Sequence, residues 1–430
     1  MPLKNFIYFP KQEDLERNGF QLEKDHGYFS VEAVERDLAW CAFQMGFISS
    51  DSNDDFNFWK NVSLPIQDEY RFLRKNYHKA WVYYVLFLRL LTLRNPFKEL
   101  SALLKTKDVK RVDYAQNYFE YKAYNTFTST LVKSNPLVSV IIPTLNRYKH
   151  LKDVLRDLEK QSYKNFEVIV VDQTDDFKAE AYNHWNLDLY YWHQKEKALW
   201  KARNSAIKKA KGDYILLYDD DSLIEADWIF HHLKTLDFFK ADISSGVSMS
   251  VIGGKPPKHY QYFRWSDQLD TGNVMIKKAV FKTTGLFDRQ FEKQRMGDGE
   301  FGLRAYLAGF KNISNPKAKR VHLKVSQGGL RQMGSWDAFR TSKLFAPKPI
   351  PSVLYFTRKY FGNRASFNFI LINVLPSVIP MKYKSNKILK LIAFLMFPIV
   401  LPLIIVQVCL SWKQSTIKLK QGSLIDALDD

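Results

Sequence analysis

Three consecutive carboxylates, Asp219, Asp220 and Asp221, are the residues of this 430-residue sequence with the clearest chemical potential. They follow a short apolar run, residues 214–218, which is typical of a buried parallel strand. Ligands of open α/β sheets bind at the carboxyl ends of strands, and hard divalent cations prefer carboxylate and phosphate oxygens. The triplet therefore predicts a site for a divalent cation that carries a diphosphate. The simpler alternative is an acidic loop in which Asp221 or Ser222 caps the next helix.

Composition narrows the partners of the protein. The formal net charge is +19 and the isoelectric point is near 9.5, which favours anionic partners: phosphate groups, acidic lipid or nucleic acid. The two cysteines, Cys41 and Cys409, cannot form a disulfide framework, which fits a reducing compartment. The first residues lack the apolar segment of a secretory signal. With 46% hydrophobic residues, the chain has enough apolar material for two or three domains.

Residues 1–131 are predicted to be mainly helical. An amphipathic helix is expected over residues 31–47, and a longer one from about Asp68 to the residue before Pro96. Within the longer helix, residues 80–88 are apolar on all sides, which favours either burial against the next domain or contact with a membrane surface. No catalytic set is evident here, and the sequence assigns this region no function.

Residues 136–345 form the predicted catalytic domain. After a linker that ends at Pro136, apolar strands alternate with helices, which predicts a parallel sheet with helices on both faces. The expected strands are 138–142, 166–171, 187–192 and 214–218, and a helix is predicted over residues 201–211. This pattern indicates an α/β fold.

Residues 346–430 are basic and apolar. Residues 391–410 are twenty residues with few polar side chains, a length just sufficient to span a bilayer. They contain Pro398 and Pro402, and lysines flank them on both sides, among them Lys382, Lys384, Lys387, Lys390 and Lys413. We expect association with the cytoplasmic face of a membrane, either peripheral or through a single span. A buried core helix is the alternative.

Four segments of the predicted domain resemble family 2 inverting glycosyltransferases, which have the GT-A fold. They are residues 138–147 (VSVIIPTLNR), 166–172 (FEVIVVD), 202–204 (ARN) and 212–221 (GDYILLYDDD). The resemblance covers roughly residues 136–325. It implies a GT-A, Rossmann-like sheet and transfer of a sugar from a nucleotide diphosphate sugar, with Mg²⁺ or Mn²⁺ as cofactor.

The resemblance also implies a donor site. Thr144, with Pro143 and Asn146, would face the nucleotide, and Asp172 would accept a hydrogen bond from the base. Arg203 would pair with the diphosphate or with Asp172. The remaining donor-site and metal-site residues are Asp219 and Asp220 for the nucleotide sugar and Asp219, Asp221 and His322 for the metal. The chain departs from the family pattern at Ala198-Leu199-Trp200, where a glycine usually precedes the Ala-Arg-Asn.

The acceptor side is expected further along the chain. Residues 272–276 and the Gly-Leu-Phe-Asp turn at 285–288 resemble the acceptor-side strand and turn of the family, and both a functional and a packing role are open for them. Asp298 falls on the position of the family's general base, with Gly297 in place of the usual glutamate. Glu300 is the second candidate for the base, and capping of the helix that runs to Ala308 is the alternative role of Asp298. A flexible lid is expected at residues 328–331, with Arg331 facing phosphate.

Together these features predict a hexosyltransferase-type enzyme that acts on a saccharide or lipid-linked acceptor in cell-surface polysaccharide synthesis. Two other classes remain open: a sugar-phosphate nucleotidyltransferase and a non-catalytic protein that binds anions or nucleic acid. The first alternative would carry a glycine-rich loop after the first strand, where this chain has Thr144-Leu145-Asn146-Arg147. The second lacks a recognisable nucleic-acid reader module, so no nucleic acid is expected among the partners.

Overall fold

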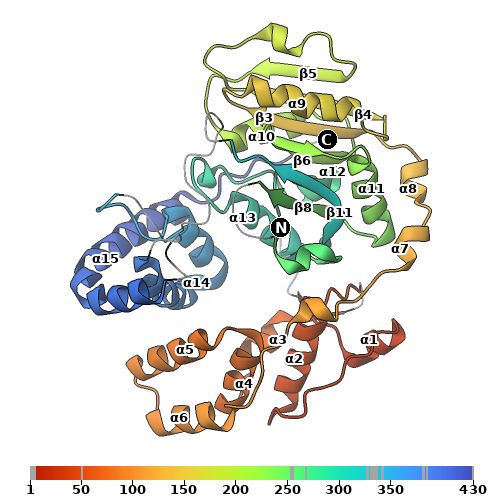
Figure 1. Cartoon of the computed structure of the whole chain (residues 1–430). Helices are drawn as coiled ribbons and strands as arrows, with labels where there is room; N and C mark the ends of the chain where they lie inside the picture. Colours follow the sequence, from red (N-terminus) through yellow and green to blue (C-terminus); the bar gives the residue numbers. More distant parts are fainter. Residues whose placement is uncertain are drawn as a thin grey trace.

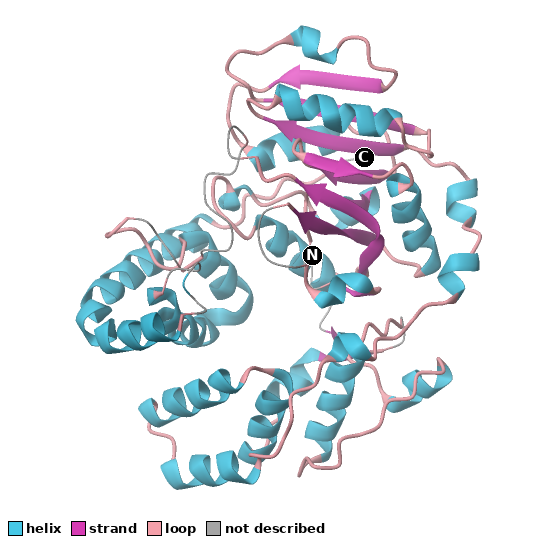
Figure 2. Ribbon diagram, in the orientation of Figure 1, coloured by secondary structure: helices cyan, strands magenta, loops and turns pink. Residues whose placement is uncertain are grey.

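The computed structural model describes residues 6–49, 52–251, 256–266, 269–325, 329, 338–339, 343–379, 383 and 386–428. Among these residues, a nine-stranded sheet forms the centre of the molecule (Figures 1 and 2). The strands run in the order β5-β4-β3-β6-β10-β8-β11-β7, and β9 pairs with β11. Their bounds are β3 (Val138–Thr144), β4 (Phe166–Asp172), β5 (Asp188–His193), β6 (Tyr214–Tyr218), β7 (Ser222–Ile224), β8 (Ile243–Ser250), β9 (Arg264–Trp265), β10 (Asn273–Lys277) and β11 (Asn312–His322).

The sheet is mixed, so the prediction of a parallel sheet is correct only for β5, β4, β3 and β6 and for the parallel pair of β8 and β11. Strands β5, β4, β3 and β6 are parallel neighbours. Strand β10 is antiparallel to both β6 and β8, and β7 and β9 are antiparallel to β11. A fully buried strand is apolar on both faces whichever way it runs, so the residue pattern of β10 does not reveal its direction.

Helices cover both faces because successive strand residues point to opposite sides. In β3, Val140 and Ile142 pack in one core, whereas Ile141 packs in the other. Residues of α9 and α11 belong to the first core, and residues of α10, α12 and α13 belong to the second. The bounds of these helices are α9 (Tyr148–Glu159), α10 (Leu199–Lys209), α11 (Trp228–Phe238), α12 (Lys278–Thr284) and α13 (Gly297–Leu307).

The chain before the sheet is mainly helical, with a two-stranded sheet of β1 (Phe6–Tyr8) and β2 (Asn53–Asp55). Its helices are α1 (Gln12–Arg17), α2 (Val31–Gln44), α3 (Phe56–Asn61), α4 (Ile66–Asn76), α5 (Lys79–Leu91), α6 (Pro96–Lys105), α7 (Ala123–Thr126) and α8 (Thr130–Lys133). The single long helix predicted from Asp68 is wrong, because α4 ends at Asn76. The His78 side chain then accepts a hydrogen bond from the Ala80 amide and caps α5.

After the sheet, α14 (Pro351–Val374) and α15 (Lys387–Gln421) form a helical hairpin. Pro398 and Pro402 lie inside α15, and Lys382 and Lys384 lie outside the described residues. Among the described residues, α15 is the helix long and apolar enough to cross a membrane by length and composition. The short 3₁₀ helices are η1 (Tyr114–Gln116), η2 (Ala179–Tyr182), η3 (Lys258–Gln261), η4 (Arg289–Phe291) and η5 (Leu375–Val378).

Candidate active site

The first aspartate of the triplet lies between two buried arginines. Asp219 follows β6 and accepts hydrogen bonds from Arg203 Nη2 of α10 at 3.0 Å and from Arg320 Nη1 of β11 at 2.8 Å. Burial opposes ionisation of Asp219, but Arg320 and Arg203 outweigh burial and hold its pKa well below the usual range. The carboxylate is therefore negatively charged at neutral pH.

The other two aspartates share a third arginine. Thr144 Oγ1 donates to Asp220 at 2.8 Å, and Arg147 Nη1 lies 2.9 Å from Asp220 and 3.0 Å from Asp221. Burial, together with the charge of Asp221, raises the pKa of Asp220 to about 6 even though Arg147 lies beside it. Three guanidinium groups thus relieve the repulsion among three adjacent carboxylates.

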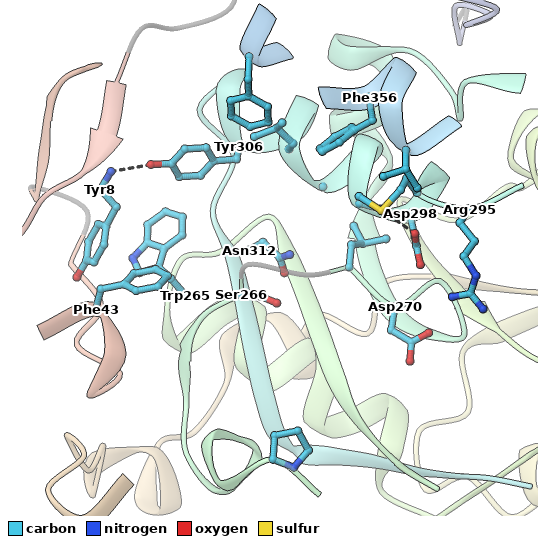
Figure 3. A pocket seen from close by; sticks show the side chains of 18 of the residues that line it. Tyr8, Phe43, Trp265, Ser266, Asp270, Arg295, Asp298, Tyr306, Asn312 and Phe356 are labelled. Carbon is cyan, nitrogen blue, oxygen red and sulfur yellow. Dashed lines mark hydrogen bonds between the residues drawn. The ribbon is translucent and has the colours of Figure 1, made fainter. Parts of the chain in front are cut away.

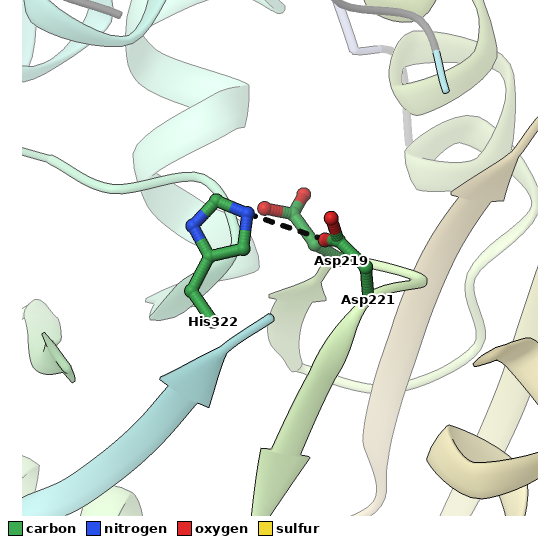
Figure 4. Close-up of side chains that lie close together, drawn as sticks. All are labelled: Asp219, Asp221 and His322. Atoms are coloured by element: carbon green, nitrogen blue, oxygen red, sulfur yellow. Dashed lines mark ion pairs between the residues drawn. The ribbon is translucent and has the colours of Figure 1, made fainter. Parts of the chain in front are cut away.

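Asp219, Asp221 and His322 form a group that fits a divalent cation (Figure 4). One potential ligand atom from each lies within 4.8 Å of the others, close to the separation of about 4.2 Å expected for opposite ligands of one Mg²⁺ ion. His322 Nε2 lies 3.3 Å from Asp221 Oδ1. Two carboxylates and an imidazole are a suitable donor set for Mg²⁺ or Mn²⁺. Asp220 faces Thr144 instead and is not a member of the group.

The residues predicted to bind the nucleoside already have partners within the protein. Both oxygens of Asp172, at the end of β4, already have protein partners: Tyr148 Oη at 2.6 Å, Tyr182 Oη at 2.7 Å and the Thr174 amide at 2.9 Å. Pro143 pairs with Val171 in the sheet, and the backbone amide of Asn146 donates to Thr174 Oγ1. Base recognition by Asp172 stays a prediction, and Oδ1, which accepts only the Thr174 amide among these partners, is the oxygen that could accept a further hydrogen bond.

A cavity of about 1350 Å³ opens beside the candidate metal site of Asp219, Asp221 and His322. Its described lining comes from three parts of the chain, and Figure 3 shows side chains from each of them. The catalytic domain supplies Arg203, Asp219, Asp270, Asp298 and His322; the N-terminal region supplies Tyr8, Trp40, Phe43, Trp59 and Phe72; the C-terminal hairpin supplies Val353, Phe356 and Phe361. This volume exceeds the roughly 300–1,000 Å³ of a typical single-ligand pocket, so it has room for two reactants.

Asp298 lies in this cavity, in the first turn of α13. Its Oδ1 accepts a hydrogen bond from the Gly299 amide at 2.8 Å, and it shares the cavity with Asp270 (Figure 3). Burial raises the pKa of Asp298, and the nearby charge of Asp270 adds to the effect. A raised pKa makes the carboxylate a stronger base, as a proton acceptor requires.

Glu300 occupies a different environment from Asp298. It is fully buried and contacts Arg304 Nη2 at 3.1 Å, Lys359 Nζ at 3.0 Å and Tyr360 Oη at 2.6 Å. It is not among the described residues that line the cavity. These partners join α13 to α14, so the position of Glu300 favours a structural role.

The two departures from the family pattern meet in space. Trp200 of α10 packs so closely on Gly297 that a Cβ atom added at Gly297 would lie 2.4 Å from the indole ring. Trp200 Nε1 also donates to the Phe291 carbonyl at 3.2 Å. The indole therefore fills the space that a side chain at position 297 would need, which explains why a glycine stands there.

Sequence reasoning missed three contributors to the site: Arg147, Asp270 and Arg320. Arg320 Nη2 contacts both oxygens of Asp270, at 3.0 and 2.9 Å, while its Nη1 holds Asp219. The sequence could have indicated Arg320, because Arg320 and His322 are two residues apart and therefore share one face of β11. Of the predicted lid, Gly328, Leu330 and Arg331 lie outside the described residues.

Residues 139–304 match the family model "Glycosyl transferase family 2". This part of the chain belongs to glycosyltransferase family 2. The family 2 segment contains the acidic triplet, Arg203 and Asp298, while Arg320 and His322 lie beyond it. The match supports the transferase among the three classes considered above and agrees with the GT-A architecture of the sheet.

Known proteins resemble the glycosyltransferase segment over part of their length. The chain is 25% identical to glycosyltransferase GlyA of Streptococcus pneumoniae over 37% of its own length and 22% of GlyA. It is 26% identical to the poly(ribitol-phosphate) β-N-acetylglucosaminyltransferase TarS of Staphylococcus aureus, over 39% of its length and 32% of TarS. It is 30% identical to EpsH of Bacillus subtilis, a putative glycosyltransferase by its name, over 46% of its own length and 63% of EpsH. The chain thus spans less than two thirds of each relative.

Two solved structures of glycosyltransferases match part of the chain. S. aureus TarS 1–349 in complex with UDP-GlcNAc has a TM-score of 0.45 and 18% identity, over 66% of this chain and 92% of that one. The mannosyltransferase PcManGT of Pyrobaculum calidifontis, in complex with GDP-Man and Mn²⁺, has a TM-score of 0.44 and 17% identity, over 70% and 93%.

Proposed function

We propose that this protein is an inverting, metal-dependent glycosyltransferase that moves a sugar from a nucleotide diphosphate donor to a hydroxyl group. The observation that carries the proposal is that Asp298 lines the same cavity as Asp219 and His322. A base and a diphosphate site facing the same space are what a single displacement at a sugar carbon needs.

The donor end of the cavity would be formed by the acidic group and Arg203. Asp219, Asp221 and His322 would hold the divalent cation, which as a Lewis acid stabilises the charge on the departing diphosphate. Arg203 is almost fully buried, and its Nε has no hydrogen-bond partner among the described residues. A buried unpaired donor is costly, and a phosphate oxygen would satisfy it. The predicted nucleoside contacts of Thr144, Asn146 and Asp172 remain part of the proposal.

Asp298 would carry out the proton transfer. Its carboxylate takes the proton of the acceptor hydroxyl as that oxygen forms a bond to the anomeric carbon. The bond from this carbon to the diphosphate oxygen breaks in the same step, and the nucleoside diphosphate leaves with the electron pair. Attack from the face opposite the leaving group inverts the anomeric configuration. We assign the base to Asp298 rather than to Glu300, because both oxygens of Glu300 accept hydrogen bonds from Arg304, Lys359 or Tyr360.

The acceptor would enter from the aromatic end of the cavity. Tyr8, Phe43 and Trp265 lie there, and α14 contributes Phe356 (Figure 3). Aromatic faces suit sugar rings and apolar lipid chains. TarS, by its name, glycosylates poly(ribitol-phosphate). We therefore retain a saccharide or lipid-linked saccharide acceptor in cell-surface polysaccharide synthesis, handled at the cytoplasmic face of a membrane.

The proposal is tested by screening nucleotide sugars for release of nucleoside diphosphate, with Mn²⁺, with Mg²⁺ and with a chelator. We expect one donor class to be turned over only when the metal is present. Asp298→Asn should reduce transfer at least about 100-fold, the usual scale for loss of a general base, with little change in nucleotide affinity. Equal loss of transfer and of nucleotide binding would contradict the role of Asp298. Turnover of no donor by the wild type would contradict the function.

A further inference from the structure

The two ends of the C-terminal hairpin are fastened at one buried residue of the catalytic domain, Asp288. From the first turns of α14, Tyr355 Oη donates to Asp288 Oδ2 at 3.1 Å, and Lys359 Nζ lies 3.4 Å away. From the segment after α15, the Leu424 amide donates to Asp288 Oδ1 at 2.9 Å. The hairpin therefore leaves the catalytic domain and returns to the same place.

The segment after α15 is docked along its length. The Leu286 amide donates to the Asp426 carbonyl at 2.9 Å, and the Arg289 amide donates to the Leu424 carbonyl at 3.0 Å. Leu428 is buried in the core formed with α10, α12 and α13. Because the start of α14 and the segment after α15 are both attached to the catalytic domain, the hairpin begins and ends on one side of any membrane that it meets. Both contacts favour the peripheral form of the earlier prediction over a single span.

Helix α15 and part of α14 present apolar side chains to solvent. The exposed large apolar residues of the hairpin are Phe361, Phe367, Ile372, Ile388, Leu391, Ile392, Phe394, Leu395, Met396, Ile399, Ile405, Val406 and Ile417. Soluble monomers rarely expose contiguous apolar patches of this kind, and larger ones mark sites of interaction with proteins or membranes. This face needs a partner.

A second apolar projection lies beside the hairpin, at the turn between α5 and α6. Leu93 is 95% exposed and Phe97 is 82% exposed, and Leu91 is exposed next to them. Tyr84 Oη of α5 donates to the Leu371 carbonyl of α14 at 2.5 Å, which connects the two elements directly. In Figure 1 the α5–α6 turn and α15 project from the same side of the molecule. We call the exposed apolar residues of the hairpin and of this turn the apolar face.

The charge around the apolar face has one sign. The sequence contains no Asp or Glu between Asp337 and Asp426, although lysines and arginines occur throughout that stretch. In α5 and α6 the acidic residue is Glu99, which is buried and paired with Arg89 at 3.3 Å. Basic residues beside apolar side chains suit the anionic headgroups of a bilayer. A second copy of this chain would bring the same excess of positive charge and would be repelled.

We propose that the apolar face is a membrane-docking surface: the α5–α6 turn and the α14–α15 hairpin enter one leaflet of an anionic bilayer together, and the chain does not cross it. The N-terminal region thereby gains a role, as the second of two membrane contacts. The entry of the catalytic cavity, lined by Phe356 and Phe361 of α14, adjoins this surface. The proposal concerns binding to lipid and does not rest on the proposed reaction.

The test uses the full chain and sedimentation with vesicles of phosphatidylcholine, alone or mixed with phosphatidylglycerol. We expect binding to the mixed vesicles that weakens as salt is added. The double variant Leu93→Asp/Phe97→Asp should bind about 100-fold more weakly, because burial of each apolar side chain is worth at least about tenfold. Leu395→Asp in α15 should weaken binding independently. Wild-type binding that neither change reduces, or no binding to either vesicle, would overturn the proposal.

Val31→Asp is the matched control. Val31 is also apolar and 71% exposed, but it is the first residue of α2, where a carboxylate suits the helix N-terminus. This variant should bind vesicles like the wild type. Protease added outside sealed vesicles should cut the segment after α15 at the same rate before and after the vesicles are permeabilised, and protection that is lost only on permeabilisation would show a span instead. Loss of a homodimer in the Leu93/Phe97 variant, with unchanged vesicle binding, would assign the apolar face to a second copy of the chain.

Discussion

At the scale of single residues, the site depends on charge compensation. Asp219 is shared by Arg203 and Arg320, while Arg147 bridges Asp220 and Asp221. Such an arrangement keeps carboxylates ionised in a buried place, ready for a cation or for the phosphates that a cation carries. Asp298 differs from Asp219, because burial raises its pKa and the charge of Arg203 offsets this only in part.

The raised pKa of Asp298 predicts the pH dependence of the reaction. A base must be deprotonated to accept a proton, so activity is lost as the pH falls through its pKa. Because that pKa is raised, the acidic limb of kcat/KM should lie above the ordinary aspartate value of about 3.9. In Asp270→Asn, which removes the neighbouring negative charge, the limb should move to lower pH. A wild-type limb at or below the ordinary value would argue against Asp298 as the base.

The contact between Trp200 and Gly297 predicts energetic coupling. Gly297→Glu, which restores the usual family residue, should lower the free energy of unfolding by about 1–3 kcal/mol, since the new side chain collides with the indole. The same change in a Trp200→Ala background should cost at least about 1 kcal/mol less. Denaturant unfolding of the four proteins measures the difference. Simple additivity of the two changes would show that the residues do not compete for space.

At the scale of elements, Asp288 connects the turn after α12 with both ends of the hairpin. The family-like turn at 285–288 allowed a functional or a packing role, and the contacts of Asp288 are those of packing. It is fully buried and accepts hydrogen bonds from the amides of Gln290 and Leu424 and from Tyr355.

Asp288→Asn should therefore loosen the hairpin. The amide loses the ion pair with Lys359 and one acceptor, so we expect the free energy of unfolding to fall by about 3 kcal/mol. Limited proteolysis should release the segment after α15 sooner than in the wild type. Asp426→Asn is the control on the same segment, since its pair with Lys208 is exposed and should contribute less than about 1 kcal/mol. Equal effects of the two changes would contradict the anchoring role of Asp288.

At the scale of the whole molecule, the cavity exists only because three parts of the chain meet. Tyr8 packs on Trp265 with ring centroids 4.9 Å apart, and the Tyr8 amide donates a hydrogen bond to Tyr306 Oη at 2.6 Å. Phe356 of α14 closes another side of the cavity (Figure 3). The N-terminal region thus shapes one wall of the cavity that contains Asp298.

Substitution of Phe43 tests whether the part of the cavity lined by the N-terminal region binds the acceptor. Phe43→Ala should raise the KM for the acceptor about tenfold, as loss of a partly buried aromatic surface implies, and leave kcat and the rate of donor hydrolysis nearly unchanged. The measurement uses the acceptor that accompanies the donor found in the nucleotide-sugar screen. A fall in kcat with an unchanged KM would place Phe43 outside the acceptor site.

The amino-acid sequence by itself determined the local elements and the identity of the reactive residues. Apolar runs such as 138–142 and 166–171 are buried strands wherever they lie, and the acidic triplet must end a strand because Tyr214–Tyr218 precedes it. Only the tertiary structure decided what depends on contacts between distant residues: the direction of β10, the three arginines among the aspartates, the burial of Glu300 and the return of the chain to Asp288. Local sequence patterns indicate burial and periodicity. Charge pairing and strand direction depend on partners that can lie about a hundred residues away in the sequence, as Asp219 and Arg320 do.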